Sequence, residues 1–215
     1  MERRPLIILG DGVYAEEVAD LVEEIGGYEI IAFARNLPPY NRSARILGKP
    51  VLSVPEMAMH AADCLVATAI GSPKRASFIA EVEALGFQFT TLIHPRSRIS
   101  PTATIRAGCL IGPGAQVSAY TQVGAHVLVN RGVLIGHHVE IEPFSTLSPG
   151  ANIAGRVRIG RGAYIGMGAL ILDERSVGAG ATVGAGSVVT HDVADGVTVI
   201  GAPARPKPPR EGSAE

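Results

Sequence analysis

Aliphatic residues recur at every sixth position through the second half of the chain. Starting at Ile93, seventeen successive positions carry isoleucine, leucine or valine without a single insertion: Ile93, Ile99, Ile105, Ile111, Val117, Val123, Val129, Ile135, Ile141, Leu147, Ile153, Ile159, Ile165, Ile171, Val177, Val183 and Val189. The residue two places before each of them is small or β-branched, with Arg175 as the exception. So strict a register indicates a structural repeat.

A six-residue unit of this kind is one short strand followed by a tight corner. The aliphatic side chain fills the interior, and the small residue lets the corner close. Three units make one triangular coil, and coils stack at the strand spacing of about 4.8 Å. A β-sandwich would instead show turn signals every 8 to 12 residues or so, without a six-residue register. The pattern therefore predicts a left-handed parallel β-helix over residues 91–205.

The first ninety residues follow a different pattern, in which strand-like and helix-like segments alternate. "RPLIIL" reads as a strand, "YEIIAFA" as a second and "CLVATAIG" as a third, and "PKRASFIAEVEALG" reads as a helix. A glycine turn after the first strand leads into another helix, whose expected apolar face is Val13, Val18, Leu21, Val22 and Ile25. Alternation of this kind predicts a small, Rossmann-like α/β domain with a parallel sheet over residues 1–90.

Composition and charge limit the binding partners and the cellular compartment that we expect for the protein. A formal net charge of −1 gives no field that would gather nucleic acid or an anionic membrane. The apolar run near the N-terminus is too short for a signal or membrane segment, and the two cysteines, Cys64 and Cys109, read as reduced and buried. We therefore expect a cytoplasmic protein with no nucleic acid or membrane partner, and a disordered tail over residues 206–215.

The turn after the first strand satisfies G-x-G-x-x-A at Gly10, Gly12 and Ala15. Alone this fingerprint is weak, and the acid expected after the second strand for a dinucleotide ribose is replaced by Arg35 and Asn36. This argues against a redox enzyme. A nucleotide phosphate seated on the helix N-terminus remains open.

Two adjacent histidines, His137 and His138, interrupt the repeat at a corner. Residues eighteen apart stack on one another, so His137 lies between Ala119 and Gly155, neither of which has a bulky side chain. The imidazole is then expected to stand beside a notch open to a ligand, rather than to be an ordinary surface histidine. His138 stacks with Tyr120 and Arg156 in a more crowded column.

Metal binding is an alternative role for the same histidines. A zinc site in this fold class needs three histidines converging across subunits. His126, His137 and His138 do not offer such a set, and we expect no metal.

Beyond these patterns, the chain resembles the bacterial nucleotide-sugar acetyltransferases of the bacillosamine, perosamine and sialic-acid pathways, from about Leu6 to Arg205. The resemblance rests on the glycine turn, "AIGSPKR", "LIHPRSRISPTATI", "VNRGVLIGHHVEIEPFSTLSPGANIAGRVRIG" and "VTVIGAPAR". It implies transfer of an acetyl group from acetyl-CoA to the amino group of a nucleotide-linked deoxysugar held by the N-terminal domain. It also implies a homotrimer with acetyl-CoA between neighbouring β-helices.

The resemblance also implies roles for single residues. It places the general base on His137, and a neutral imidazole is suited to take the proton of an attacking amine. His138 stands where the family has an acid that orients the base, with Glu140, Glu142 or an acid from a neighbouring subunit as possible substitutes. Thr146 stands where the family often has a second histidine near the thioester. Implied substrate contacts are Gly12, Val13, Tyr14, Arg35, Asn36, Gly71 and Asn130. Implied acetyl-CoA contacts are Thr146, Gly155, Met167 and Ala185.

Two alternatives remain open at this point. One is O-acetylation of a sugar, as in the sialic-acid type. The other is a non-catalytic β-helix that binds ligand but has lost the acid and the second histidine. For the trimer, we expect aliphatic residues such as Val127 and Leu128 to be exposed and to pack laterally.

Overall fold

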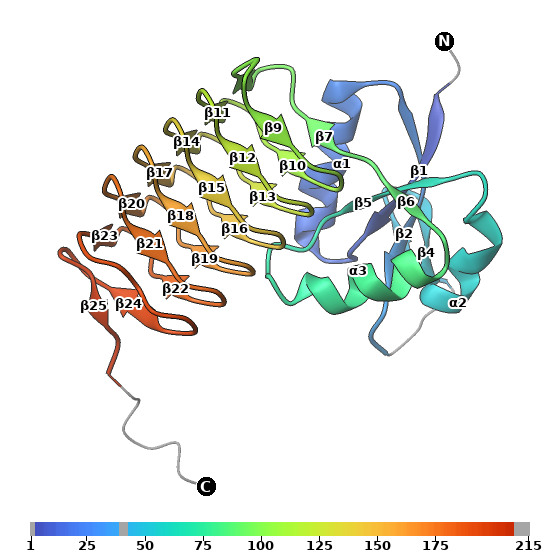
Figure 1. The fold of residues 1–215 in the computed structure, drawn as a ribbon. Coiled ribbons are helices and arrows are strands. Elements are labelled where there is room, and N and C mark those ends of the chain that lie inside the picture. The colour runs from blue at the N-terminus through green and yellow to red at the C-terminus, as the bar shows by residue number, and fades with distance from the viewer. Residues whose placement is uncertain (1–2, 39–42, 209–215) are drawn as a thin grey trace, which may run out of the picture.

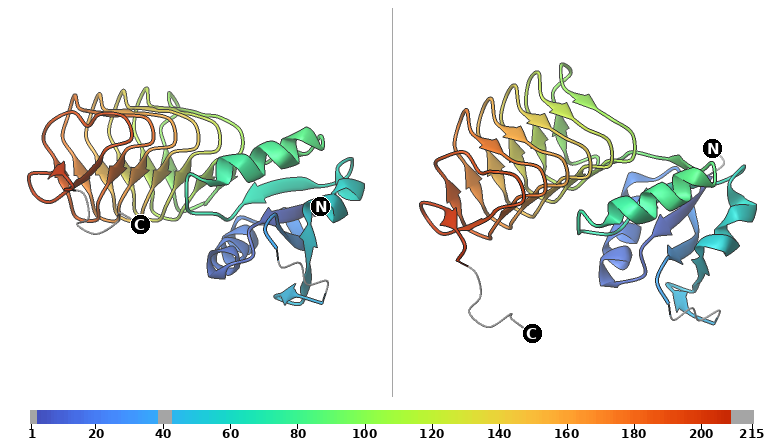
Figure 2. Two further views of the ribbon diagram at one scale, coloured as in Figure 1. Left: turned by 90° about the horizontal axis from the view of Figure 1, so that it is seen from below. Right: turned by 60° about the horizontal axis from the view of Figure 1, so that its bottom comes forward.

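The computed structural model describes residues 3–38 and 43–208 of the chain. An α/β domain ends with β6 (Gln88–Phe89), and a β-helix begins with β7 (Leu92–Ile93). The α/β domain lies against the end of the β-helix at which β7 stands, and the last coils are at the opposite end (Figures 1 and 2). The predicted fold class, a small parallel α/β domain followed by a left-handed β-helix, is confirmed.

The β-helix is a three-sided prism of very short strands. Its first face consists of β7, β10 (Leu110–Ile111), β13 (Leu128–Val129), β16 (Thr146–Leu147), β19 (Tyr164–Ile165), β22 (Thr182–Val183), β24 (Thr198–Ile200) and β25 (Arg205–Pro206). Its second face consists of β8 (Arg98–Ile99), β11 (Gln116–Val117), β14 (Leu134–Ile135), β17 (Asn152–Ile153), β20 (Leu170–Ile171) and β23 (Val188–Val189). Its third face consists of β9 (Thr104–Ile105), β12 (Gln122–Val123), β15 (Glu140–Ile141), β18 (Arg158–Ile159) and β21 (Ser176–Val177).

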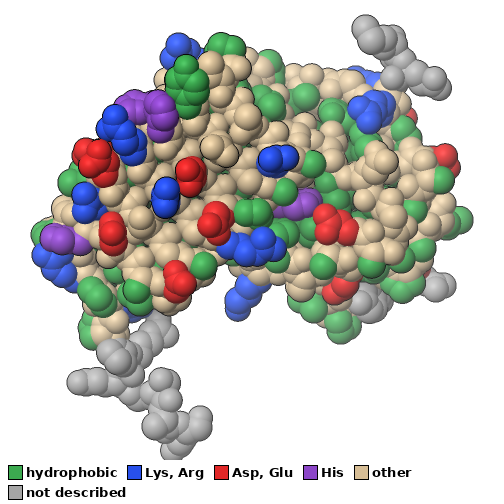
Figure 3. Space-filling model, in the orientation of Figure 1, with side chains coloured by type: hydrophobic (Ala, Val, Ile, Leu, Met, Phe, Trp, Pro, Cys, Tyr) green, Lys and Arg blue, Asp and Glu red, His purple; other side chains and the backbone are tan. Residues whose placement is uncertain are grey.

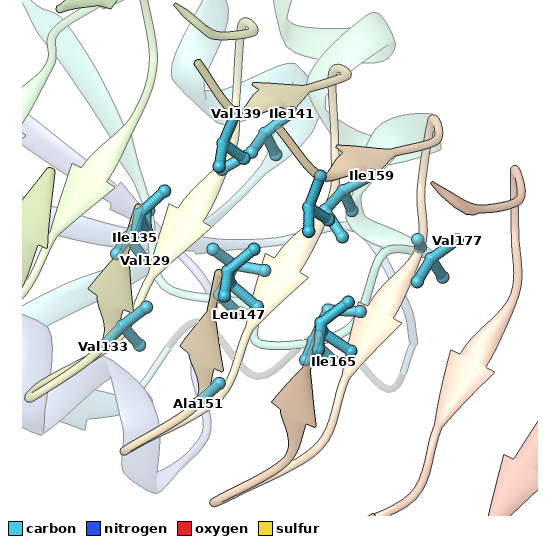
Figure 4. Close-up of a cluster of buried hydrophobic side chains, with 14 of the residues drawn as sticks. Val129, Val133, Ile135, Val139, Ile141, Leu147, Ala151, Ile159, Ile165 and Val177 are labelled. Atoms are coloured by element: carbon cyan, nitrogen blue, oxygen red, sulfur yellow. The ribbon is translucent and has the colours of Figure 1, made fainter. Parts of the chain in front are cut away.

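The register of the faces is the one that the six-residue period predicts. Leu134 pairs with Asn152 and Glu140 pairs with Arg158, so each residue stacks on the one eighteen places later. The aliphatic residue of each unit points inward, and from Ile111 to Val189 these side chains form one continuous buried core (Figure 4). Burial of this ladder of branched side chains is the main stabilising contribution to the prism.

The α/β domain is a six-stranded sheet in the order β3-β4-β2-β1-β5-β6, in which all pairs but β3 with β4 are parallel. Its strands are β1 (Arg4–Leu9), β2 (Tyr28–Arg35), β3 (Arg45–Ile46), β4 (Lys49–Ser53), β5 (Leu65–Thr68) and β6. Its helices are α1 (Val13–Ile25), α2 (Val54–Met57), a single 3₁₀ turn (Ala58–His60) and α3 (Arg75–Ala84).

Three features of this domain differ from the expectation. The hairpin of β3 and β4 and the short helix α2 were not predicted, because this segment has no extended periodicity and its hairpin turns at Leu47 and Gly48, both with positive φ. Val13 was assigned to the apolar face of α1 but is 86 % exposed. It is the first residue of the helix, just after the N-cap Gly12, where the helix has not yet reached the sheet.

The two parts of the molecule share a buried boundary. Leu92 and Leu110, on the first face of the β-helix, belong to the same apolar cluster as the inner side of α1. Leu128 continues this row and is 2 % exposed, and Val127 points into the core of the prism. The expectation that Val127 and Leu128 are free for packing between subunits is therefore wrong, since the α/β domain and the prism interior cover them.

Three exposed leucines lie on the second face and its border with the third. Leu134, Leu170 and Leu172 are 40 %, 41 % and 44 % exposed. The third face is polar, with Glu140 and Arg158 forming an ion pair at 3.5 Å. On the side of the molecule seen in Figure 3, acidic and basic side chains are interspersed rather than gathered into one patch.

Several smaller expectations concern the ends and the cysteines. Cys64 and Cys109 are free and buried, as predicted. Pro206, expected to begin the tail, instead ends β25, and the Lys207 amide donates to the Thr198 carbonyl; residues 209–215 lie outside the described residues. Within the described ranges, no helix combines the length and the apolar character needed to cross a membrane.

Candidate active site

A cavity of about 430 Å³ opens at the carboxyl ends of three neighbouring strands of the α/β sheet. We call it the strand-end cavity, and it is lined by Gly10, Asp11, Gly12, Arg35, Asn36, Leu37, Ala69, Ile70, Gly71, Ser72 and Phe78. In open parallel sheets this crevice is where ligands bind. The structure thus brings together four of the residues implied as substrate contacts: Gly12, Arg35, Asn36 and Gly71.

The polar side chains of this cavity are arranged around Arg35. Its Nε lies 3.1 Å from Asp11 Oδ2, an ion pair in which the N–H is not aimed at the oxygen, and this buried Nε has no hydrogen-bond partner. The Asn36 amide donates to Glu81 at 3.4 Å. A buried donor without an acceptor at the wall of a cavity is a feature that a ligand would satisfy.

A second cavity, of about 550 Å³, lies where the α/β domain meets the first face of the β-helix. We call it the junction cavity, and it is lined by Gly71, Ser72, Pro73, Lys74, Asn130, Thr146, Ser148, Pro149, Gly162, Tyr164, Met167, Gly180 and Thr182. Gly71 and Ser72 line both cavities, so the two are continuous around this loop. Lys74 is the one charged side chain among the lining residues of the junction cavity.

Tyr14 and Asn130 lie close to each other beside this junction. The Tyr14 hydroxyl is buried without a hydrogen-bond partner of good geometry, and burial, with Glu17 nearby, raises the pKa of Tyr14. Tyr14 is therefore neutral and faces the β-helix rather than the strand-end cavity. Val13 does not line either cavity.

Arg75, at the start of α3, joins the α/β domain to the β-helix. It is 2 % exposed and donates to the carbonyls of His126, Phe144 and Ser145 at 2.8, 3.0 and 2.9 Å. Its other terminal nitrogen donates to the Thr146 hydroxyl at 2.7 Å. No carboxylate among the described residues pairs with it, and burial lowers the pKa of Arg75 to about 10, which still leaves the guanidinium charged at neutral pH.

The Thr146 hydroxyl is consequently engaged in hydrogen bonds within the protein. Its hydroxyl accepts from Arg75 and donates its single proton to the Gly71 carbonyl at 3.0 Å. Thr146 lines the junction cavity, yet in this arrangement it has no proton left for a thioester carbonyl. Sequence reasoning missed this because nothing in the six-residue repeat shows that Arg75 reaches the prism.

His137 and His138 occupy the corner between the second and third faces, and both are exposed. Their Nδ1 atoms lie 3.1 Å apart and their rings are nearly perpendicular, so one ring donates to the other. The Tyr120 ring packs beside His138 with 4.9 Å between centroids, as the predicted column requires. Glu140 pairs with Arg158 and Glu142 accepts from the Arg161 amide, so neither of these carboxylates supports His137.

Gly155 shapes the site of His137. A Cβ at this position would lie 2.8 Å from His137 Cε1 and 2.9 Å from Nε2, which is too close. The imidazole therefore rests in the space that a missing side chain leaves open, with its Nε2 edge over Gly155. The predicted neighbours of His137 are those that the structure shows.

The implied acetyl-CoA contacts lie on two different edges of the prism. Gly155 is on the corner between the second and third faces, whereas Met167 and Ala185 are on the corner between the first and second faces. One chain therefore does not bring His137 and the junction cavity together. Within the described residues, no group of three or more histidine, cysteine or acidic side chains is placed to hold a metal ion.

The chain is similar to known proteins over nearly its whole length. Residues 5–81 match the family model of the PglD N-terminal domain. The acetyltransferase domain of PglB from Neisseria gonorrhoeae, solved in complex with acetyl coenzyme A, is 32% identical with a TM-score of 0.86, over 96% of this chain and 100% of that one. No curated protein matches the chain in sequence.

Two further solved structures are similar over almost the full length. One is a variant of perosamine N-acetyltransferase from Caulobacter crescentus in which a histidine is replaced by asparagine, solved in complex with CoA and GDP-perosamine. It is 26% identical to this chain with a TM-score of 0.87, over 95% of this chain and 97% of that one. WeeI from Acinetobacter baumannii is 28% identical with a TM-score of 0.85, over 95% of this chain and 100% of that one.

Proposed function

This chain belongs to the hexapeptide-repeat nucleotide-sugar acetyltransferases and uses acetyl-CoA, and we propose that it acetylates the amino group of a nucleotide-linked amino-deoxysugar with His137 as general base. The observation that carries the proposal is the exposed His137 imidazole with its Nε2 edge over Gly155. The continuity of the strand-end and junction cavities supports a substrate with a nucleotide at one end and a sugar at the other.

The chemistry assigned to His137 is a proton transfer. The amine nitrogen attacks the thioester carbonyl, the C–S bond breaks, and the products are an amide and the free thiol of CoA. The attacking nitrogen must lose one proton, which His137 Nε2 accepts when its own proton is on Nδ1 and is donated to His138 Nδ1. The proton then passes to the leaving thiolate, which balances the reaction.

His138 takes a positioning role in this scheme. By accepting from His137 Nδ1 it keeps the lone pair on Nε2, on the side of Gly155. A neutral histidine supplies orientation without the fixed negative charge of an acid. Protonation of His138 would reverse the hydrogen bond and remove the free lone pair from His137 Nε2, so activity requires the neutral pair.

The substrate is expected to lie along the carboxyl ends of the strands. The sheet order places Arg35 at the end of β2, Gly12 after β1 and Gly71 after β5, in this spatial sequence toward the cavity that Gly71 shares with the β-helix. The first-turn amides of α1, whose N-cap Gly12 offers no side-chain cap, suit the phosphates. The amino sugar then reaches the junction cavity beside Asn130.

A homotrimer would complete the site. Met167 and Ala185 lie on one border of the second face and Gly155 with His137 on the other, so packing of neighbouring second faces would join the two edges across a subunit boundary. The partly exposed Leu134, Leu170 and Leu172 support burial of this face. Acetyl-CoA would lie in the resulting groove, where small residues let the pantetheine approach the backbone. We place this enzyme in the cytoplasm, where both substrates are made.

The test is turnover of acetyl-CoA with a panel of nucleotide-linked amino sugars, measured as released thiol and by mass of the sugar product. A product heavier by one acetyl group that resists mild base is an amide and supports the proposal. A base-labile ester would show O-acetylation instead. Binding of acetyl-CoA without turnover of any amino sugar would show a non-catalytic protein.

A further inference from the structure

We propose that Arg35 selects the nucleobase of the substrate, and that the base it accepts is guanine or cytosine. This inference rests on the proposed function, because it assumes that the strand-end cavity holds a nucleotide. It adds the class of nucleotide to that function.

The position of Arg35 assigns it to the base. The sugar has to reach the junction cavity, which shares Gly71 and Ser72 with the strand-end cavity. Arg35 is the last residue of β2, which is separated from β5 by β1, so it stands at the opposite end of the strand-end cavity from Gly71. A nucleotide sugar laid along the cavity therefore brings its base, not its phosphates, to Arg35.

The chemistry of Arg35 restricts what it binds. A guanidinium carries only donors, in a planar fork that matches two acceptors side by side. Here its buried Nε has no hydrogen-bond partner, and Asp11, at 3.1 Å, holds the group at the cavity wall. Arg35 lines the cavity and carries donors only, so the group that it would bind there is an acceptor.

Only two common bases present adjacent acceptors on one edge. Guanine offers N7 and O6, and cytosine offers N3 and O2. Adenine places its N6 amino donor beside N7 and N1, and uracil and thymine place the N3–H donor between their two carbonyls. The cavity also has apolar walls for a flat ring at Phe78, Ile70 and Leu37, the last of which is 67 % exposed.

The experiment is calorimetric binding of GDP, CDP, UDP and ADP to the full-length protein, without acetyl-CoA. We expect GDP or CDP, or both, to bind roughly 10- to 100-fold more tightly than UDP and ADP, the usual worth of one bidentate contact. Arg35→Gln should remove this preference, while the affinity for UDP and ADP changes by less than about threefold. Arg35→Lys keeps the charge but not the fork, and should also lose the preference.

Arg3→Gln is the matched control, because it removes one positive charge from the same domain at an exposed ion pair with Glu23. It should leave all four affinities unchanged. Equal binding of the four nucleotides by the wild type, or equal weakening of all four in Arg35→Gln with recovery in Arg35→Lys, would overturn the proposal. The second result would show that Arg35 binds phosphate.

These outcomes are separable from the proposed function. A protein that acetylates a nucleotide amino sugar but binds all four bases equally leaves the function intact and refutes the base selection. A protein that binds none of the four nucleotides contradicts both the inference and the nucleotide part of the proposed function.

Discussion

The β-helix and the α/β domain are built on different rules. In the prism, each residue has the same neighbours as the residue eighteen places away, so Ile135, Ile153 and Ile171 occupy one repeated environment. In the α/β domain no such repeat exists, and a single side chain such as Arg75 makes four contacts that occur nowhere else. In the proposed function, the prism supplies a rigid edge for chemistry, and the domain supplies an irregular cavity for recognition.

Because of this difference, substitutions in the two regions should have different effects on turnover, nucleotide binding and stability. Changes on the edge of the prism should alter turnover without altering nucleotide binding. Changes in the strand-end cavity should lower the affinity for the nucleotide sugar and, through it, turnover, and changes at the boundary should affect stability first.

The largest effect is expected for His137→Ala. Loss of the base should lower turnover by roughly 10²- to 10⁴-fold, with little change in the affinity for acetyl-CoA or nucleotide. His138→Ala should cost less, because it removes only orientation, and His191→Ala, an exposed histidine at the far end of the prism, is the control. Near-normal turnover of His137→Ala at neutral pH would mean that the amine arrives deprotonated and that positioning alone suffices.

Arg75→Met tests the boundary between the two regions. It leaves the Thr146 hydroxyl and three carbonyls without their buried donor, and we expect a loss of roughly 3–5 kcal/mol in the free energy of unfolding. Urea denaturation measures it, and Arg161→Met, at an exposed arginine on the same side of the prism, should cost far less. Equal costs would show that the two regions are not joined through Arg75.

Gly155→Ala tests the shape of the catalytic edge. The added Cβ would collide with the His137 ring, and we expect about a tenfold loss of turnover with the prism still folded. In the His137→Ala background the same substitution should have almost no further effect, because the ring it displaces is gone. Additive losses would show that Gly155 acts independently of His137.

A smaller effect is expected of pH on the stability of the boundary between the α/β domain and the prism. His126, stacked on Phe144 and 3.2 Å from Glu83, has its pKa lowered, chiefly by burial. Since the unfolded chain then binds a proton that the folded chain resists, stability should fall as pH drops through about 6.5, the ordinary histidine value. In thermal melts at several pH values, the melting temperature of His126→Asn should fall less steeply with decreasing pH than that of the wild type. An identical fall in both proteins would assign the loss of stability to other groups.

The same contrast explains how much could be predicted from the sequence. The period of six gave the faces, the core and the column of Ala119, His137 and Gly155, because in a solenoid spacing along the chain is position in space. The convergence of Gly12, Arg35 and Gly71 was also predictable, since the carboxyl ends of parallel strands meet at one edge.

What escaped prediction depends on contacts between the regions. Leu128 looks like any outward-facing residue of the repeat until the α/β domain covers it. The hydrogen bonds of Thr146 with Arg75 and Gly71 likewise have no signature in the six-residue repeat. Neither contact leaves a periodic signal, because each is made once.

The central claim is that the substrate bound in the cavities of one chain reacts at His137 of a neighbouring chain. Mixed trimers test this claim most directly. His137→Ala lacks the base, and Gly71→Asp places a negative charge in the wall shared by both cavities, where a new Cβ meets no atom within 4 Å. Each variant alone should be nearly inactive. Co-expressed with different tags and purified through both, they should form trimers with about one third of wild-type activity, since one of three boundaries then joins an intact His137 to an intact cavity. Trimers no more active than the separate variants, or a protein that sediments as a monomer, would contradict this account.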